Sequence, residues 1–262
     1  MNSERGSATR LRAGREEGMG GLAKGLAIIE SFNAKNPRLT ISEAAAASGI
    51  TPAAARRCLR TLEELGFVMY DGKFYRPTPR MMRLSSAYSE ADSLPILAGP
   101  RLVAAREAFD ESASLAVLDG EEIIFVARSE SSHTASTGMR VGSRMPALLA
   151  AAGRVLIAAQ SEEQIAAHLE SFRPVRLSDG SAFTVAAARG KIEETAQLGY
   201  SYTDEELEAG VRAIAVPVVN ARGATLAAMS ISALSARFTM GQMRERFLPV
   251  LLEEARRLGS ML

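Results

Sequence analysis

Three arginines stand close together in the segment AAARRCLR, at Arg56, Arg57 and Arg60. A guanidinium stays charged in proteins, and its planar fork of N–H groups pairs with phosphate oxygens or with the O6 and N7 acceptors of guanine. Small residues precede the arginines, and a methyl group such as that of Ala54 can contact the methyl of thymine. These residue types are those of a surface that binds nucleic acid.

Two short helices are needed to present these side chains, and the sequence predicts both. Thr40 and Glu43 form a capping-box pattern, which predicts a helix over residues 41–48 that ends at Gly49. Thr51 with Pro52 predicts the start of a second helix, over residues 51–65. The candidate DNA contacts on the second helix are Thr51, Ala53, Ala54, Arg56, Arg57 and Arg60.

A hairpin pattern follows the second helix. Residues 67–75 alternate around an Asp71-Gly72 turn, which predicts a two-stranded wing. Lys73, Tyr75 and Arg76 are expected to lie along the DNA backbone. Helical spacing over residues 22–32 and 80–90 completes the layout of a winged helix-turn-helix with a linker helix. Two alternatives remain: the arginines form a solvated helix face, or the winged helix serves protein contacts alone.

The charge of the chain is unevenly distributed. The 262 residues carry a net charge of +1, but residues 1–90 hold 14 basic and 9 acidic residues, whereas residues 91–262 hold 17 and 21. A basic first third suits a polyanion-binding module attached to a second domain. We predict a disordered arm over residues 1–21, the winged helix-turn-helix over 22–79, the linker helix over 80–93 and a second domain over 94–262.

The residues that would carry catalysis or bind a metal are sparse. Cys58 is the single cysteine, and His133 and His168 lack a metal-ligand spacing. The sequence has no nucleophile elbow, phosphate-binding loop or dinucleotide fingerprint, and the adjacent acids Glu205 and Glu206 face different directions in most backbones. We therefore expect no catalytic residues, metal or cofactor. An enzyme acting on a small acid is the least favoured alternative. Without an apolar span or a secretory signal, we expect a cytoplasmic protein that does not enter the membrane.

The second domain mixes helix and strand patterns, which predicts an α+β fold. A hairpin over residues 114–118 and 123–127 surrounds an Asp119-Gly120 turn. The remaining strands are expected at 136–141, 200–202, 213–219 and 224–232, and the helices at 98–111, 147–160, 162–171, 183–198 and 240–262.

Several motifs in one order resemble the IclR family of transcriptional regulators. They are KGLAIIESF, LTISEAAAASGITPAAARRCLRTLEELGFV, DGKFYRPTPRMMRL, SLAVLDGEEIIFVAR, VGSRMPALLAAAGRVLIAA and GVRAIAVPVVNARGATLAAMSIS. The resemblance covers residues 22–260 and is nearest to the branch that regulates aromatic-acid catabolism through the β-ketoadipate pathway. It implies a winged helix-turn-helix, a linker helix and a GAF-like effector-binding domain. It also implies a repressor or activator that binds a double-stranded DNA operator and a small organic acid as a homodimer or tetramer, with RNA polymerase as a candidate further partner.

The resemblance also implies where the acid binds. The family's effector residues correspond here to Thr203, Val211, Ala213, Ser230 and Ser232, with Met145 and Leu148 as candidate walls. An acid needs a cation to balance its carboxylate, and Arg128 and Arg144 are the candidates. The run of residues 147–152 is apolar where the related branch is more polar. The alternative for Arg128 and Arg144 is a surface or interface salt bridge. The alternative for Ser230 and Ser232 is that they are ordinary strand serines whose hydroxyls bond to the backbone.

Overall fold

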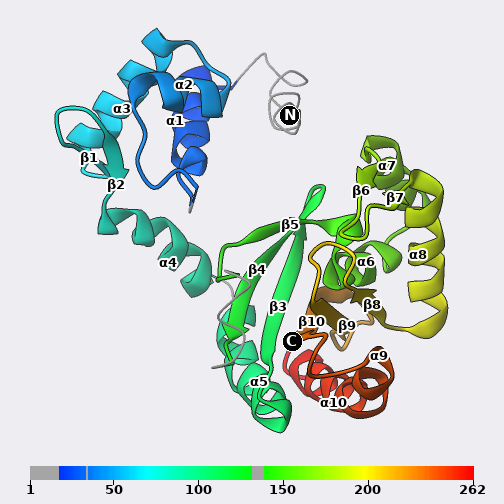
Figure 1. The fold of residues 1–262 in the computed structure, drawn as a ribbon. Coiled ribbons are helices and arrows are strands. Elements are labelled where there is room, and N and C mark those ends of the chain that lie inside the picture. Colours follow the sequence, from blue (N-terminus) through cyan, green and yellow to red (C-terminus); the bar gives the residue numbers. More distant parts are fainter. Residues whose placement is uncertain (1–17, 34, 92, 132–138) are drawn as a thin grey trace. The chain divides into compact units, whose positions relative to one another are not determined.

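The computed structural model describes residues 18–262 except 34, 92 and 132–138, and it divides into two compact units, residues 1–91 and 92–262. The first unit contains helices with a small hairpin at one side (Figure 1). Its elements are α1 (Gly20–Ser31), α2 (Ile41–Ser48), α3 (Pro52–Glu64), β1 (Val68–Tyr70), β2 (Tyr75–Pro77), the 3-10 turn η1 (Pro79–Met81) and α4 (Met82–Ala91).

The capping residues expected from the sequence fix where α2 and α3 begin. Thr40 and Glu43 form both hydrogen bonds of a capping box at α2, and Gly49 ends this helix in the left-handed conformation at φ 66°. The Thr51 hydroxyl accepts from the backbone of Ala54 at the start of α3. The core between the helices and the wing is built on Ile28 and Leu59, both fully buried. The predicted arm over residues 1–21 lies mostly outside the described residues, and α1 begins at Gly20.

The wing contains a third extended segment. The backbone of Leu39 exchanges two hydrogen bonds with that of Tyr75, with N···O distances of 2.8 and 2.9 Å. The segment before α2 is therefore attached to the hairpin that follows α3. This bridge fixes the wing to the helix-turn-helix by backbone contacts.

The second unit is built on one antiparallel sheet of six strands in the order β5-β4-β3-β10-β9-β8. Its strands are β3 (Ser112–Asp119), β4 (Glu122–Ser129), β5 (Arg144–Pro146), β8 (Ser201–Asp204), β9 (Val211–Val219) and β10 (Thr225–Leu234), with a separate hairpin of β6 (Val175–Arg176) and β7 (Ala182–Phe183). Its helical elements are α5 (Leu94–Phe109), η2 (Ala147–Leu149), α6 (Ala151–Ala158), α7 (Glu162–Ser171), α8 (Val185–Leu198), α9 (Met240–Gln242), the π-helical η3 (Met243–Phe247) and α10 (Leu248–Gly259).

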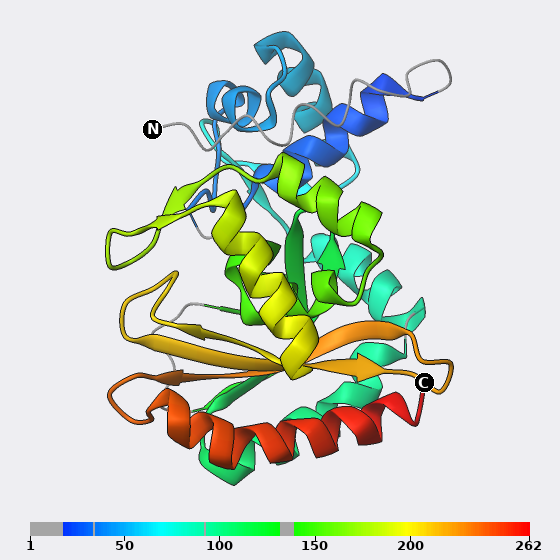
Figure 2. The same ribbon diagram turned by 90° about the vertical axis from the view of Figure 1, so that its right-hand side faces the viewer.

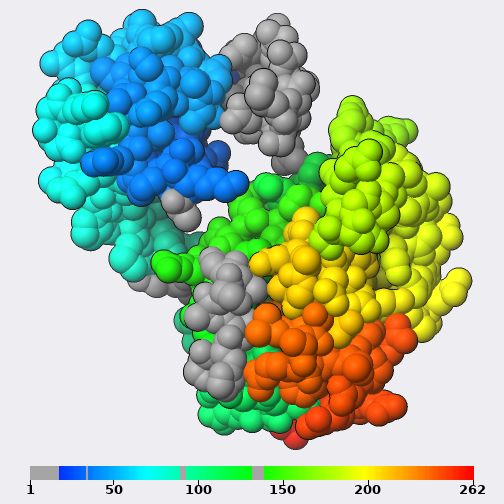
Figure 3. All heavy atoms as spheres, in the orientation of Figure 1, coloured from blue at the N-terminus to red at the C-terminus, as the bar shows by residue number. Residues whose placement is uncertain are grey.

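Helices cover both faces of this sheet (Figure 2). Helices α5 and α10 pack on one face around the fully buried Leu115, Met229 and Phe247. Helix α6 and the turn η2 pack on the other face, against Ala116, Ala215 and Ala228. In the space-filling view, α7 and α8 form a continuous outer surface on that side (Figure 3).

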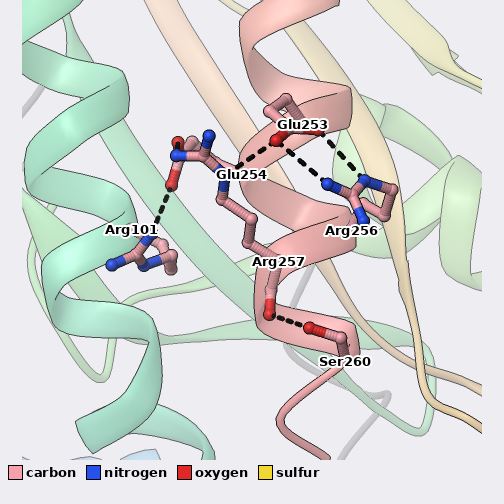
Figure 4. Close-up of polar contacts among 6 residues, drawn as sticks. All are labelled: Arg101, Glu253, Glu254, Arg256, Arg257 and Ser260. Atoms are coloured by element: carbon pink, nitrogen blue, oxygen red, sulfur yellow. Dashed lines mark hydrogen bonds and ion pairs between the residues drawn. The ribbon is translucent and has the colours of Figure 1, made fainter.

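A chain of ion pairs joins α5 and α10 (Figure 4). Glu254 on α10 is only 5% exposed and pairs with Arg101 on α5 at 3.3 Å and with Arg257 at 2.9 Å. Glu253 pairs with Arg256 and Arg257 on the same helix. The buried Glu254 carboxylate thus keeps two cationic partners, as a charge removed from water requires.

Three predicted elements of the second unit were wrong in detail. Residues 136–138 of the expected strand lie outside the described residues, residues 139–141 are not extended in a sheet, and the edge strand is β5 instead. The helix expected over 147–160 is broken at Ala150, whose backbone is extended. The terminal helix contains a π-helical stretch just before Pro249, which removes one N–H from the helical ladder.

Candidate functional site

Helix α3 presents its three arginines to solvent. Arg56, Arg57 and Arg60 are exposed, and within the described residues their guanidinium groups make no hydrogen bond or ion pair. The amphipathic pattern of α3 explains this placement, because the opposite side of the helix, with Leu59 and Leu62, is buried in the core of the first unit. Fifteen donors in all are left available for an anionic partner.

A groove runs between the starts of α2 and α3. Its lining residues are Ile41, Ser42, Pro52, Ala53, Arg56 and Arg57. Helix N-termini carry unsatisfied N–H groups and a partial positive charge, and both favour phosphate oxygens. The groove therefore combines two helix starts with two free guanidinium groups, which is a suitable geometry for a DNA backbone or base edge.

Two of the predicted DNA contacts are not accessible. Ala54 and Tyr75 are each 4% exposed and belong to the core of the first unit. Ala54 is buried on α3 beside the fully buried Ala55, one turn before the partly buried Cys58. Tyr75 faces inward because β2 alternates; its ring stacks on Tyr70 at 4.6 Å between centroids. The structure therefore corrects these two predictions.

Four other predicted DNA contacts are exposed, and a further cation lies beside the wing. Lys73 and Arg76 are exposed, as are Thr51 and Ala53. The guanidinium of Arg38 lies 4.4 Å from the centre of the Phe74 ring, and the Lys73 ammonium lies 5.0 Å from it. Arg38 joins the wing through the neighbouring Leu39–Tyr75 bridge, a long-range pairing for which the sequence gives no local signal.

A row of polar side chains crosses the sheet of the second unit. Arg128 lies opposite Ser114, Ser114 opposite Ser230, Ser230 opposite Ala215, and Ala215 opposite Ser201. Residues directly opposite one another in an antiparallel sheet point to the same face. Because Ala215 packs in the cluster with η2 and α6, the row lies on the face that those elements cover.

A second row lies two residues further along the strands on the same face. Ser112 lies opposite Ser232, Ser232 opposite Ala213, and Ala213 opposite Thr203. Val211, two residues before Ala213, points to this face near the strand start. The sheet register thus brings together five of the predicted effector residues, namely Thr203, Val211, Ala213, Ser230 and Ser232.

Hydroxyl groups in these rows have unused hydrogen-bonding capacity. Ser201, Thr203 and Ser230 are 3%, 9% and 9% exposed, and Ser232 is partly buried. Within the part of the chain that the structure describes, these four hydroxyls make no hydrogen bond. Their shared face therefore offers hydrogen-bond donors and acceptors to a polar ligand.

Arg128 supplies a positive charge at one end of the first row. Its Nη1 donates to the Ser114 hydroxyl at 2.7 Å, and its Nε lies 3.5 Å from the exposed carboxylate of Glu130. The Nε is buried without a hydrogen-bond partner among the described residues. Burial lowers the pKa of this guanidinium, and Glu130 partly opposes that effect. Arg128 is therefore a cation that is only weakly neutralised.

The other predicted arginine does not belong to this site. In the pairing of β4 with β5, Arg144 lies opposite Ile124, whereas Met145 lies opposite Ile123, so the two point to opposite faces. Arg144 instead forms an exposed ion pair with Glu122 at 2.7 Å and with Asp119. Hydrogen bonds and charge from those carboxylates raise its pKa against a lowering effect of burial. The candidate role of Arg144 in balancing an acid was thus wrong.

The apolar run of residues 147–152 forms the covering layer. These residues are all at most 6% exposed and pack in the cluster on the polar-row face, with Met145 partly buried against it. Leu148 is 4% exposed in this layer. Gly153 permits the close packing of η2 on α6, because a Cβ there would lie 2.1 Å from the carbonyl oxygen of Ala147. An apolar layer therefore covers the face of the sheet that carries the polar rows.

The described residues contain neither a metal-binding cluster nor a membrane-spanning helix. No group of three or more histidine, cysteine or acidic side chains is arranged to hold a metal ion in the described part of the chain. Among those same residues, no helix is long and apolar enough to cross a membrane.

Comparison with known proteins identifies the families of both units. Residues 21–72 match the IclR helix-turn-helix domain, and residues 87–260 match the C-terminal domain of bacterial IclR transcriptional regulators. The chain is 34% identical to the Pca regulon regulatory protein of Pseudomonas putida over 97% of this chain and 89% of that protein. It is 32% identical to the p-hydroxybenzoate hydroxylase transcriptional activator of Acinetobacter baylyi over 94% of this chain and 93% of that protein.

A solved structure shares the fold of the chain. It is that of an IclR homologue from Microbacterium hydrocarbonoxydans in complex with 4-hydroxybenzoate, and it superposes with a TM-score of 0.77. The sequence identity is 24%, and the match covers 91% of this chain and 97% of that one.

Proposed function

Because the chain belongs to the IclR family of transcriptional regulators, we propose that it binds an operator through α3 and the wing, and that a small aromatic acid on the sheet of the second unit controls this binding. The observation that carries the proposal is the row Arg128–Ser114–Ser230–Ala215–Ser201. It places a weakly neutralised cation and unpaired hydroxyls on one covered face.

The DNA half of the proposal rests on the free arginines of α3. A recognition helix fits the major groove with its first residues toward the base edges. Arg56 and Arg57 lie at the groove between α2 and α3, where base edges and phosphates are both within reach of a docked helix. Lys73 and Arg76 on the wing, with Arg38 beside it, are suited to the flanking phosphates.

The acid half of the proposal follows from the charges in the row. A carboxylate between Arg128, Ser114 and Ser230 would accept charge-assisted hydrogen bonds, which are the stronger kind. Ser201 lies two strands beyond Ser230, roughly 10 Å away along the sheet, with only the small Ala215 between them. A flat ring over Ala215 would then direct a second polar group toward Ser201 and Thr203.

This geometry favours a hydroxylated aromatic monocarboxylate. One guanidinium stands in the row, and Arg154 near the Ser201 end is already paired with Glu206. A second carboxylate at that end would therefore lack a free cation, whereas a phenolic hydroxyl would be satisfied by the two side-chain hydroxyls there. The proposal agrees with relatives whose names refer to p-hydroxybenzoate hydroxylase and the Pca regulon.

We further propose that the regulator acts as a homodimer. Large apolar side chains remain exposed on two helices of the first unit: Leu22 and Leu26 on α1, and Met82, Leu84 and Tyr88 on α4. A second copy would cover them, since apolar patches of this kind mark interaction sites. A dimer would present two recognition helices to half-sites about one helical turn apart, and a shift in their spacing would change operator affinity.

A titration against DNA tests the proposal. The full-length protein is titrated into labelled DNA from upstream of its own gene, with excess unrelated DNA, and with 4-hydroxybenzoate, benzoate or adipate added. We expect specific binding that 4-hydroxybenzoate alters most and adipate least. Binding no tighter than to unrelated DNA would favour a protein-contact module. Specific binding that none of the acids changes would refute the effector site alone.

A further inference from the structure

A fully buried arginine lies behind the candidate effector site. Arg154 on α6 is 0% exposed, and it has the largest side chain among the fully buried residues. Taking a guanidinium out of water is costly unless its donors are paired, and a well-packed apolar residue is often equally stable in such a place. The position of Arg154 therefore calls for a role that an apolar side chain could not fill.

The donors of Arg154 join separate parts of the second unit. Its Nε donates to the carbonyl of Leu148 at 2.8 Å, and its Nη1 donates to the carbonyl of Tyr202 at 3.1 Å. Its Nη1 and Nη2 also form a two-pronged ion pair with the carboxylate of Glu206, at 3.2 and 2.5 Å. The guanidinium lies 5.2 Å from the centre of the Phe183 ring, on β7.

Two of these contacts fall on walls of the site. Leu148 belongs to the covering layer, and Tyr202 lies between Ser201 and Thr203 on β8. Strand β8 is an edge strand, so its outer carbonyls have no neighbouring strand to supply a donor. Arg154 supplies that donor at Tyr202. The covering layer and the hydroxyl-bearing edge of the sheet are thus held by one side chain.

Glu206 is itself held from several directions. Its backbone carbonyl accepts from Ser178 N at 2.9 Å. The preceding Glu205 adopts a left-handed backbone at φ 56°, and its carboxylate accepts from Gly210 N at 2.8 Å and pairs with Arg212 at 3.3 Å. The loop after β8 is therefore built to present the Glu206 carboxylate to Arg154. The adjacent acids Glu205 and Glu206 have separate partners, and each fixes one side of this loop.

We propose that Arg154 and Glu206 form a latch that positions Leu148 and the β8 hydroxyls around the effector, so that effector affinity depends on a pair that does not touch the acid. This inference rests on the proposed function. Arg154 is a positioning residue, because four of its five N–H donors are already used by protein acceptors. Loss of the latch would widen the distance between the covering layer and β8.

Three variants separate positioning from mere stability. The double variant Arg154→Met with Glu206→Leu replaces a buried ion pair by apolar groups, a change that often preserves stability. Arg154→Lys keeps the charge but loses the planar fork, which a lysine cannot reproduce. Arg189→Met is the matched control, because Arg189 forms an exposed ion pair with Glu162 on the surface of the same unit.

The thermal midpoint, the operator affinity without acid and the affinity for 4-hydroxybenzoate are measured for each full-length variant. We expect the double variant to fold with a lowered thermal midpoint, because the carbonyls of Leu148 and Tyr202 lose their donor. It should bind the operator as the wild type does, but bind 4-hydroxybenzoate about tenfold or more weakly, as the loss of a hydrogen bond from a displaced β8 hydroxyl would give. Arg154→Lys should show an intermediate loss, and Arg189→Met none.

The outcomes distinguish the latch from the site. Wild-type affinity for the acid in the double variant would overturn the latch. If that variant fails to fold, Arg154→Lys decides, because unchanged acid affinity there would overturn the latch as well. A wild-type protein that binds its operator but not the acid would refute the effector site, and the latch with it.

Discussion

Arg128 and Ser114 lie directly opposite one another on β4 and β3, and the guanidinium of Arg128 donates to the Ser114 hydroxyl at 2.7 Å. Ser114 uses only one of the N–H donors of Arg128, and the buried Nε has no hydrogen-bond partner among the described residues. A carboxylate arriving between Arg128 and Ser230 would complete this arrangement.

Replacing Arg128 should therefore remove most of the affinity for an acid. Hydrogen bonds to charged groups contribute about 1.5–3 kcal/mol, so Arg128→Gln is expected to weaken 4-hydroxybenzoate binding by about 10- to 150-fold. Calorimetric titration measures this change. Arg144→Gln is the control, because Arg144 lies on the opposite face in an exposed pair. Equal losses in both variants would contradict the role of Arg128.

Removing the central hydroxyls should separate sensing from DNA binding. Ser230 and Ser232 point to the covered face, and neither is in the first unit. The double variant Ser230→Ala with Ser232→Ala is expected to bind the operator as the wild type does and to lose its response to the acid. Operator titrations with and without 4-hydroxybenzoate test this. A normal response would refute these serines as effector contacts.

Arg57→Ala should weaken operator binding by about 1–3 kcal/mol if the guanidinium contacts a base with two hydrogen bonds. A phosphate contact would instead reduce the slope of log affinity against log salt by about one and weaken binding to all sequences alike. Anisotropy titrations at several salt concentrations distinguish the two. Lys35→Ala, an exposed cation in the loop before α2, is the control. Unchanged affinity and slope would remove Arg57 from the contact surface.

Two glycine substitutions should change stability in opposite directions. Gly153→Ala would place a Cβ 2.1 Å from the backbone oxygen of Ala147, so η2 or α6 must shift and the thermal midpoint should fall. Gly190→Ala on α8 meets no atom within 4 Å and should stabilise by about 0.5–1 kcal/mol through helix propensity. Thermal melting of both variants measures this. A lower midpoint for Gly190→Ala than for Gly153→Ala would contradict the packing described.

The capping box of α2 should be lost in acid. Hydrogen bonds from the backbone and side chain of Thr40 lower the pKa of Glu43 below its ordinary value of 4.5. A carboxylate with a lowered pKa stabilises the folded state above its unfolded pKa and loses that contribution as the pH falls through the folded pKa. The stability difference between the wild type and Glu43→Gln should therefore shrink below pH 4.5. A difference that is constant from pH 7 to pH 3 would contradict this.

Local signals predicted the elements better than the contacts between them. The caps at Thr40 and Thr51, and the Asp71-Gly72 turn, act within four residues, so the sequence predicts the helix-turn-helix and its wing. The burial of Tyr75 depends on pairing with Leu39, which lies 36 positions earlier. The alternating pattern therefore predicted that Tyr75 lies on a strand, but not that its side chain faces the core.

The effector site shows the same limit. The spacing of Ser230 and Ser232 predicts a shared face, but their alignment with Ser114 and Arg128 depends on strand register, including a bulge near Leu115. Arg144 and Arg128 are equivalent candidates for binding a carboxylate when only the sequence is considered. The register of the strand pairing places them on opposite faces of the sheet. Arg154 was not predicted, because its partner Glu206 lies 52 residues away and no local pattern links the two.

The Leu39–Tyr75 bridge has a consequence for how operators can change. Since two backbone hydrogen bonds join the wing to the segment that leads into α2, the wing and the helix-turn-helix of one chain keep a fixed geometry. Under the proposed function, substitutions on α3 would change the preferred bases without changing the backbone attachment of the wing. Under the proposed function, an acid bound to the second unit would therefore change operator affinity by moving whole DNA-binding domains, because the wing does not move independently of the helix-turn-helix.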